Sequence, residues 1–300
     1  MENKLHVGII GLDTSHVEGF ANFVTSYNQH NFDQIKISAA FPGGSSDFEL
    51  SYGRVEQYTN LLKGNFGIEI VDSPRQVAEK SDAILITSVD GRVHLEQFLA
   101  VAPFQKPVFI DKPFTVDITS ATKIFEIAEE HGTPVIGCSP LRYDQSLEAA
   151  LSDASKGMIV GADCFGPLNL EPTQPGLFWY GIHTVEMLYT ILGIGCEKVY
   201  ATKNKDHELV IGEWKDGRIG TIRGNRIGNR EFGSTIHRDS GTQYTNSTLS
   251  RQIYHAYQNE RIIDFFKTGK LAIDKEETIE IIQFIEAVNK SRLNGKVVQL

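Results

Sequence analysis

The chain has 300 residues, 41% hydrophobic and 22% charged, a composition typical of a globular protein long enough for two domains. Its formal net charge of −9 argues against nucleic-acid or anionic-membrane partners, because phosphate groups are bound by clustered Lys and Arg. No run approaches the roughly 20 apolar residues of a membrane span. Three widely spaced cysteines fit neither a zinc site nor a disulfide framework, so we expect no metal and a reducing, cytoplasmic location.

In the first half of the chain, short apolar runs alternate with segments of helical periodicity. The pattern predicts strands at residues 5–10, 35–41, 68–71, 82–87, 108–110 and 134–137, and helices at 16–27, 54–62, 74–80, 93–102 and 118–131. Strands that alternate with helices at this pitch indicate a doubly wound parallel sheet with helices on both faces, in an α/β domain over residues 1–140.

The pattern changes near residue 142 and predicts a second domain over residues 141–300. Helices are expected at 143–151, 180–192, 250–268 and 275–292, and strands at 158–165, 198–202, 208–214, 218–223, 232–237 and 296–299. The pair Asp216-Gly217 favours a hairpin, because Asp-Gly readily supplies positive φ. We therefore expect an α+β domain with an open, mostly antiparallel sheet.

Asp111 and Lys112 stand where a predicted buried strand ends, and Pro113 stops the strand pairing there. Ligands of open α/β sheets collect outside the carboxyl ends of the strands, so this lysine is well placed to touch a ligand. The alternative is a solvated Asp-Lys turn, which is common after any strand.

The first predicted strand leads into the segment Gly11-Leu12-Asp13-Thr14-Ser15-His16, where a nucleotide-binding protein carries GxGxxG. Gly11 fits the first glycine, whereas Asp13 and His16 occupy the second and third positions. Asp13 brings a negative charge close to two phosphates unless it points away. Asp13, Thr14 and Ser15 are good N-cap residues, and the N–H groups of the helix N-terminus remain available to an anion.

The second predicted strand ends at Phe41, where an acid holds the ribose hydroxyls of NAD in many dinucleotide-binding domains. The following loop contains Ser45, which together with Ser46 and Arg54 can accept a 2′-phosphate. Equally, this segment is simply a flexible loop. NAD and NADP are therefore both open as cofactors.

Five short segments, in the right order, resemble the glucose–fructose oxidoreductase and inositol dehydrogenase family (Gfo/Idh/MocA) over nearly the whole chain. They are residues 7–11, residues 84–89 with His94, residues 111–113 in place of Glu-Lys-Pro, Gly137 with residues 142–143, and residues 181–186. The resemblance implies a Rossmann domain followed by an α/β domain whose open sheet often packs against another subunit. It also implies NAD(P)-dependent oxidation or reduction of sugars, polyols and related small molecules.

The resemblance also implies roles for particular residues. Lys112 is expected near the reacting oxygen, where an ammonium stabilises a developing alkoxide, and His183 is expected to accept the proton. The cofactor is expected to contact Gly8, Gly11, Thr14, Ser15, Ser45, Ser88, Val89, His94, Asp111 and Lys112. The substrate is expected to contact Arg142, Tyr143, Trp179, Tyr180 and His183. For Arg142, pairing with an acid is the alternative. Asp13 and the remaining histidines receive no catalytic role.

The surroundings of His183 depart from the family pattern. The family usually has an aspartate four residues before this histidine, and here that position is Trp179, which cannot orient an imidazole although it can stack on a sugar face. His183 and Glu186 share a helix stripe apart from the apolar one, so His183 need not be core. Glu186 is expected either to polarise His183 or to form a salt bridge on the helix surface. The basic run Arg223, Arg226 and Arg230 is expected to line a pocket for an acidic sugar or to form a solvated face.

Competing functions follow from these observations. The leading hypothesis is an NAD(P)-dependent oxidoreductase that moves a hydride between a sugar- or polyol-like substrate and C4 of the nicotinamide. The altered glycine turn, Phe41 and Trp179 favour the alternative, a non-catalytic nucleotide- or sugar-sensing protein of the same fold. A third option is a redox-neutral enzyme that uses bound NAD transiently. The expected partners are a carbohydrate-like small molecule and a second copy of the chain, bound through the C-terminal sheet.

Overall fold

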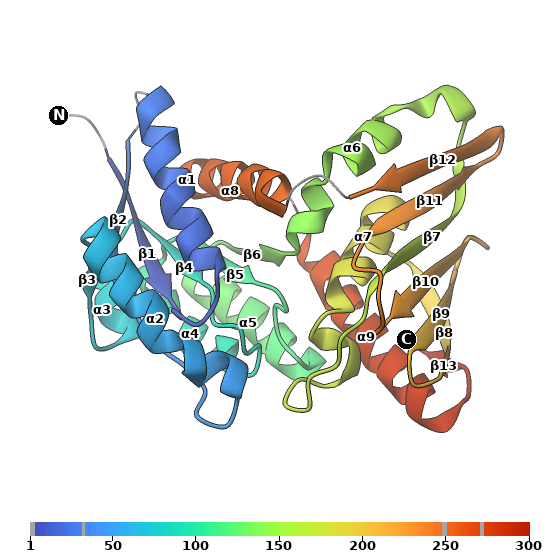
Figure 1. Cartoon of the computed structure of the whole chain (residues 1–300), viewed down its shortest axis with the longest axis horizontal. Helices are drawn as coiled ribbons and strands as arrows, with labels where there is room; N and C mark the ends of the chain where they lie inside the picture. The colour runs from blue at the N-terminus through green and yellow to red at the C-terminus, as the bar shows by residue number, and fades with distance from the viewer. Residues whose placement is uncertain (1–3, 32–33, 248–250, 271–272) are drawn as a thin grey trace. The chain divides into compact units, whose positions relative to one another are not determined.

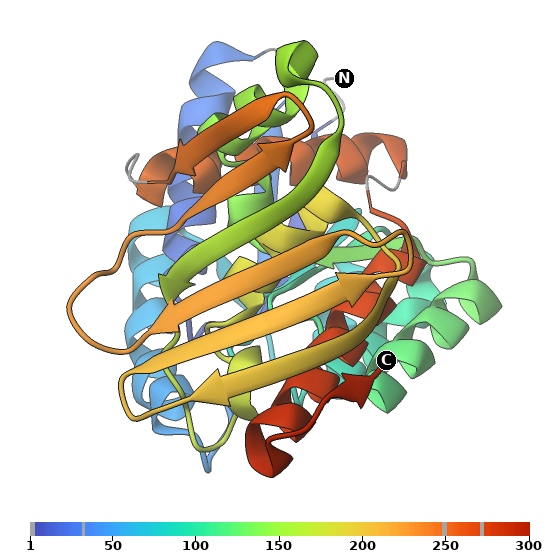
Figure 2. The same cartoon turned by 90° about the vertical axis from the view of Figure 1, so that its right-hand side faces the viewer.

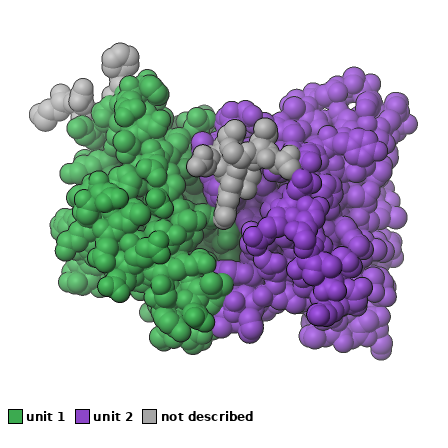
Figure 3. Space-filling view, viewed as in Figure 1, with its two compact units in different colours: residues 1–115, 119–138, 258–273 green, residues 116–118, 139–257, 274–300 purple. Residues whose placement is uncertain are grey.

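The computed structural model describes residues 4–31, 34–247, 251–270 and 273–300, and the chain forms two compact units. Unit 1 comprises residues 1–115, 119–138 and 258–273, and unit 2 comprises residues 116–118, 139–257 and 274–300 (Figure 3). Residues 258–273 thus belong to unit 1, although the sequence pattern assigned them to the second domain. The simple division at residue 140 stays a prediction.

Unit 1 contains six parallel strands in the order β3-β2-β1-β4-β5-β6 (Figure 1). They are β1 (Leu5–Ile10), β2 (Ile35–Phe41), β3 (Glu69–Ile70), β4 (Ala83–Ile86), β5 (Val108–Asp111) and β6 (Val135–Cys138). The predicted doubly wound parallel sheet is confirmed, because its central strands are short apolar runs that are buried along their length. The strand order reverses between β1 and β4, and ligands of such sheets bind at this reversal.

The helices of unit 1 pack in pairs, α1 beside α2 and α3 beside α4. Their bounds are α1 (His16–His30), α2 (Glu49–Phe66), α3 (Pro74–Glu79), α4 (His94–Val101), the 3-10 turn η1 (Ala102–Phe104) and α5 (Ile118–His131). Helix α2 is much longer than the predicted 54–62. It ends at Gly67, whose left-handed conformation (φ 64°) closes the last turn.

Helix α8 (Arg251–Thr268) joins unit 1 from late in the sequence. Gln258 Nε2 donates to the Cys138 carbonyl at 2.9 Å, and Lys267 Nζ donates to the Tyr27 hydroxyl at 3.0 Å. These contacts fix α8 to the end of β6 and to α1. The predicted helix began at residue 250, which lies outside the described residues.

Unit 2 contains seven strands in the order β12-β11-β7-β10-β9-β8-β13 (Figure 2). They are β7 (Ile159–Pro167), β8 (Cys196–Lys203), β9 (His207–Trp214), β10 (Ile219–Asn225), β11 (Gly233–Arg238), β12 (Gly241–Asn246) and β13 (Val298–Gln299). Among the described strands the β7–β10 pair is parallel and the other pairs are antiparallel, which confirms the mostly antiparallel sheet. The predicted Asp216-Gly217 hairpin joins β9 to β10, and Gly217 takes φ 88°. Strand β12 was not predicted.

The helices of unit 2 are α6 (Gln145–Ser152), α7 (Ile182–Leu192) and α9 (Lys275–Asn294), with 3-10 turns η2 (Pro140–Tyr143), η3 (Ala154–Lys156) and η4 (Gly176–Phe178). Helix α6 starts two residues later than predicted because the Asp144 carboxylate caps it, accepting from Leu147 N–H at 3.1 Å. Helices α7 and α9 pack on the sheet, and Figure 2 shows its other face uncovered by described residues. Across the described residues, every helix is too short or too polar to cross a membrane.

Candidate active site

The carboxyl ends of β1 and β4 meet where the strand order of unit 1 reverses. Thr87, just after β4, joins the two ends: its N–H donates to the Ile10 carbonyl at 2.7 Å, and its hydroxyl donates to the Gly11 carbonyl at 2.6 Å. The turn after β1 and the loop after β4 are therefore held together at the point where this class of sheet binds ligands.

Gly11 is required by two features of this turn. Its φ of 94° lies in the region that favours glycine, and a Cβ at this position would fall on the hydroxyl and the backbone nitrogen of Ser88. Gly8 serves a different purpose, because a Cβ there would fall on Val77 and Ser81. Gly11 thus belongs to the turn where a ligand is expected. Gly8 instead allows α3 to pack closely against β1, whereas the sequence predicted a contact between Gly8 and the cofactor.

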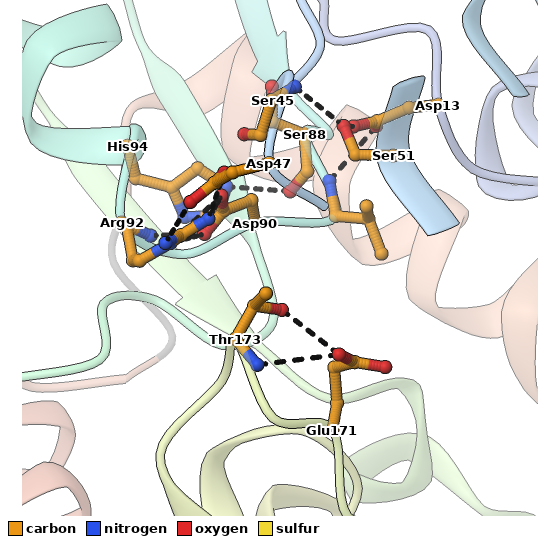
Figure 4. Close-up of polar contacts among 11 residues, drawn as sticks. Asp13, Ser45, Asp47, Ser51, Ser88, Asp90, Arg92, His94, Glu171 and Thr173 are labelled. Atoms are coloured by element: carbon orange, nitrogen blue, oxygen red, sulfur yellow. Dashed lines mark hydrogen bonds and ion pairs between the residues drawn. The ribbon is translucent and has the colours of Figure 1, made fainter. Parts of the chain in front are cut away.

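Asp13, in the place of the second glycine, points into the neighbouring loops. Its carboxylate accepts from the Ser51 hydroxyl at 2.6 Å and from Val89 N–H at 3.0 Å, and the residue is fully buried (Figure 4). Burial raises the pKa of Asp13, and the hydrogen bonds from Ser51 and Val89 oppose that rise. Asp13 therefore ties the turn after β1 to α2 and to the loop after β4.

The start of α1 differs from the expected capped helix. Ser15 stands at the N-cap position with helical backbone angles and makes no side-chain capping bond. The Thr14 hydroxyl instead accepts from His16 N–H at a long 3.4 Å. Thr14 is buried and Ser15 is exposed, so the two predicted cofactor contacts stand in different environments.

Two residues of α4 hold the loop after β4 by hydrogen bonds. Gln97 Nε2 donates to the Ser88 hydroxyl at 2.7 Å. Both ring nitrogens of the buried His94 face carbonyl oxygens, that of Ser88 at 2.8 Å and that of Phe114 at 3.0 Å. His94 therefore links the loop after β4 to the segment after β5, which gives it a bracing role beside the predicted cofactor contact.

The end of β5 holds an acid, an imidazole and a lysine together. His16 Nδ1 contacts one oxygen of the buried Asp111 carboxylate, and the other oxygen accepts from Lys112 N–H at 2.8 Å. Burial alone would raise the pKa of Asp111, but the His16 ring and Lys112 outweigh burial and lower it below its ordinary range. His16 was given no role from the sequence, yet it fixes the carboxylate next to Lys112.

In unit 2, His183 lies at the start of α7 among aromatic rings. The Tyr180 and Phe232 rings meet it edge-on, with centroids 5.3 Å and 5.7 Å away. Its Nδ1 is 2.7 Å from the Ser139 hydroxyl, which also accepts from Leu141 N–H. If Nδ1 donates to Ser139, the other ring nitrogen is left as a proton acceptor. Ser139 thus provides a neutral orienting partner for the histidine, which Trp179 cannot provide.

Glu186 and Arg142 form a buried ion pair in unit 2, which corrects two predictions. The Glu186 carboxylate accepts from Arg142 Nε and from Ser139 N–H, each at 3.0 Å, and Arg142 also donates to Glu277 at 2.5 Å. Glu186 is 5% exposed, so its salt bridge is not on the helix surface. His183 itself is buried, so the second stripe of α7 is core as well. Both carboxylates pair with the Arg142 guanidinium, which is the alternative expected for this residue, and its contact with substrate stays a prediction.

The other predicted substrate contacts are divided between core and partly exposed positions. Tyr143 is buried in η2, and Trp179 follows η4 at intermediate exposure. The arginines of the basic run differ in their surroundings: Arg226 pairs with the buried Glu208 at 2.5 Å, whereas Arg223 and Arg230 are exposed. The exposure of Arg223 and Arg230 fits the solvated face expected as the alternative for this run, and the pocket for an acidic sugar stays a prediction.

Sequence reasoning missed His16, Ser139 and Phe232. His16 and Asp111 are 95 residues apart, and only the strand order β1-β4-β5 brings their elements to one sheet edge. Phe232 fits beside His183 because Gly166 on β7 has no side chain, since a Cβ there would fall on the Phe232 ring. No pattern in the local sequence indicates the contact of His16 with Asp111 or that of Phe232 with His183.

A parallel sheet with a required glycine in the turn at its strand-order reversal defines a Rossmann-type dinucleotide-binding domain. Residues 5–137 match the sequence profile of the Gfo/Idh/MocA oxidoreductases, described as an oxidoreductase family with an NAD-binding Rossmann fold. The match lies in the first domain and covers less than half of the chain, so it is the Rossmann domain that resembles this family.

Solved structures share the fold over both units. Scyllo-inositol dehydrogenase from Lactobacillus casei, with bound NAD(H) and scyllo-inositol, is 15% identical, with a TM-score of 0.81 and 99% of each chain covered. A probable dehydrogenase from Thermotoga maritima is 18% identical, with a TM-score of 0.80 and coverage of 98% of this chain and 99% of that chain. GenD2 from gentamicin A biosynthesis, in complex with NAD, is 15% identical, with a TM-score of 0.81 and coverage of 99% and 96%. A comparison with curated proteins finds no match.

Proposed function

We propose that this protein transfers a hydride between a nicotinamide dinucleotide and a sugar- or polyol-like alcohol or ketone. The observation that carries the proposal is the turn after β1, where Gly11 has a φ of 94° and lies against Ser88 at the strand-order reversal. The profile match over residues 5–137 and the inositol-bound fold neighbour support this choice of chemistry.

The residues of the turn fit a dinucleotide. The negative Asp13 side chain is directed at Ser51 and Val89, and its charge is met by their hydrogen bonds. A bound nicotinamide ring would supply the hydride acceptor or donor. We assign the turn residues Gly11, Thr14 and Ser15, the loop residues Ser45, Ser88 and Val89, and the end of β5 to cofactor contact. His94 positions these loop residues through its hydrogen bond with the Ser88 carbonyl.

Lys112 and His183 are assigned the proton and charge chemistry. The Lys112 ammonium stabilises the negative charge that develops on the oxygen of the carbon that gives up the hydride, and Asp111, fixed by His16, orients the Lys112 backbone. His183 takes the hydroxyl proton in alcohol oxidation and returns it in ketone reduction. Ser139 holds Nδ1 of His183 so that the opposite nitrogen can exchange this proton. Tyr180 and Trp179 offer apolar ring surface to a sugar face.

We assign the uncovered face of the unit 2 sheet to contact with a second copy of the chain. Apolar side chains point outward there, including Tyr200 and Ile219, which are 37% and 51% exposed. Together with the reduced cysteines, this is consistent with a homo-oligomeric cytoplasmic enzyme. Sedimentation of the purified protein tests the assembly.

The decisive experiment combines cofactor binding with turnover. NADH and NADPH are titrated against the purified protein by fluorescence, and a panel of inositols, sugars and their ketones is then assayed at 340 nm. We expect binding of at least one dinucleotide and turnover of at least one polyol or its ketone. Binding without turnover across the panel would favour the sensing protein instead. Absence of binding would refute the dinucleotide assignment itself.

A further inference from the structure

Three charged side chains form a cluster beside the predicted cofactor loops of unit 1. Arg92, in the loop after β4, donates to both oxygens of Asp47 at 2.8 and 2.9 Å and to both oxygens of Asp90 at 2.8 and 3.0 Å (Figure 4). Asp47 lies in the loop after β2. The cluster therefore links the two loops through a guanidinium that is held by two carboxylates.

The two carboxylates of this cluster differ in exposure. The Asp90 side chain is 1% exposed and the Asp47 side chain is 66% exposed. The hydrogen bond from Arg92 lowers the pKa of Asp47, so this exposed carboxylate is ionised at neutral pH. The cluster carries one positive and two negative charges, and Asp47 is the carboxylate that faces solvent.

Asp47 lies in the loop that follows β2, and dinucleotide-binding domains read the adenosine ribose with an acid after this strand. The last residue of β2 itself is the apolar Phe41. Ser45, two residues before Asp47, is 8% exposed, and its hydroxyl has no hydrogen-bond partner among the described residues. Its N–H is fixed by the Ser51 hydroxyl, which in turn bonds Asp13 of the glycine turn. The loop thus combines an unused hydroxyl with a fixed carboxylate next to the turn.

We propose that Asp47, held by Arg92, makes this protein select NAD(H) over NADP(H). The inference rests on the proposed function. A ribose 2′-hydroxyl donates to a carboxylate, as the acid after β2 does in NAD-binding domains. A 2′-phosphate carries a charge of about −1.5 to −2 and would meet the exposed carboxylate, while the charge of Arg92 is already matched by two acids.

The test measures dissociation constants for NADH and NADPH by fluorescence in the wild type and in variants. We expect the wild type to bind NADH at least tenfold more tightly than NADPH. In Asp47→Asn this ratio should fall about tenfold, because the repelling charge is gone and Arg92 keeps only one acidic partner. Glu49→Gln is the matched control, since it removes an exposed acid two residues away and should leave the ratio unchanged.

A double variant identifies the group that receives the phosphate. In Asp47→Asn/Arg92→Ala, the part of the gain in NADPH affinity that comes from the freed guanidinium should disappear, and only the part that comes from the lost charge repulsion should remain. Equal or tighter NADPH binding by the wild type would overturn the selection and leave the oxidoreductase proposal standing. An unchanged ratio in Asp47→Asn would remove Asp47 as its cause. If the wild type binds neither dinucleotide, the selection and the proposed function fail together.

Discussion

The turn after β1 and the end of β5 each bury a carboxylate, and the two carboxylates are stabilised in opposite ways. Asp13 is met by neutral donors, the Ser51 hydroxyl and the Val89 N–H, and burial raises its pKa. Asp111 is also buried, but the His16 ring and Lys112 outweigh burial and lower its pKa. One carboxylate therefore acts as a tie between loops, and the other is part of a charged set around Lys112.

The difference separates the scaffold of the site from its chemistry. Replacing a glycine by Asp13 is tolerated because its charge is directed into hydrogen bonds between loops. At Asp111 the charge itself matters, because it is coupled to a cationic neighbour that the proposed mechanism uses. Mutations at the end of β5 should therefore affect turnover as well as stability, and mutations in the turn should act mainly through stability.

The largest effect is expected for Lys112→Ala. Loss of the ammonium at the reacting oxygen should lower kcat by about 10³-fold, while NADH affinity changes less than about threefold. Steady-state kinetics and fluorescence titration measure the two quantities. Lys123→Ala is the control, since Lys123 is an exposed lysine on α5 paired with Glu126. Unchanged turnover in Lys112→Ala would remove this residue from the mechanism.

Gly11→Ala should be the most destabilising change in the turn. Alanine at φ 94° is strained, and its Cβ would fall on Ser88, so we expect a loss of about 3 kcal/mol in the free energy of unfolding. Gly19→Ala, at an exposed position near the start of α1 with open space around it, should instead stabilise by about 0.5–1 kcal/mol. Urea denaturation compares both variants with the wild type. A tolerated Gly11→Ala would show that the turn can relax.

The elements of the fold were predictable where burial leaves a pattern in the sequence. The strands of unit 1 are short apolar runs, and the β9–β10 hairpin carries Asp216-Gly217, so both were predicted correctly. Strand β12 was missed because Gly241–Asn246 has no apolar alternation and becomes a strand by pairing with β11. The ends of α2 were missed because its outer turns are largely exposed and lack apolar periodicity.

The site was predictable only in its separate parts. Gly11, Lys112 and His183 stand in short motifs, and the sequence therefore identified them. The residues that position Lys112 and His183 are distant in the sequence. His16 holds Asp111, the neighbour of Lys112, from 95 residues away, and Ser139 binds His183 from 44 residues away. Such pairs depend on strand order and on the packing of α7, which single-sequence patterns do not contain.

Asp111→Asn should cost about 2 kcal/mol at pH 7, because it leaves His16 beside an uncharged amide in a buried position. The pKa of Asp111 lies below its ordinary value of 3.8 in the folded state, so its charge stabilises the protein above that pH. This contribution is lost as the pH falls from about 4 toward the folded pKa. Urea unfolding between pH 3 and pH 7 should show a shallower acid loss in the variant. An equally steep loss would mean that other groups cause it.

Asp13→Asn should have the smallest effect and the opposite dependence on pH. The folded pKa of Asp13 lies above 3.8, so between 3.8 and that value the native state holds more protons than the unfolded state. Wild-type stability from this group therefore falls as the pH rises through that window and stays at the lower level above it. Asparagine keeps an acceptor for Val89 N–H without the buried charge, so we expect a change within about 1 kcal/mol at pH 7.

The stability difference between variant and wild type, measured by urea unfolding from pH 4 to pH 7, should move in favour of the variant as the pH rises. Movement toward the wild type would mean that Ser51 and Val89 hold the ionised carboxylate more strongly than burial penalises it, and Asp13 would then resemble Asp111 after all.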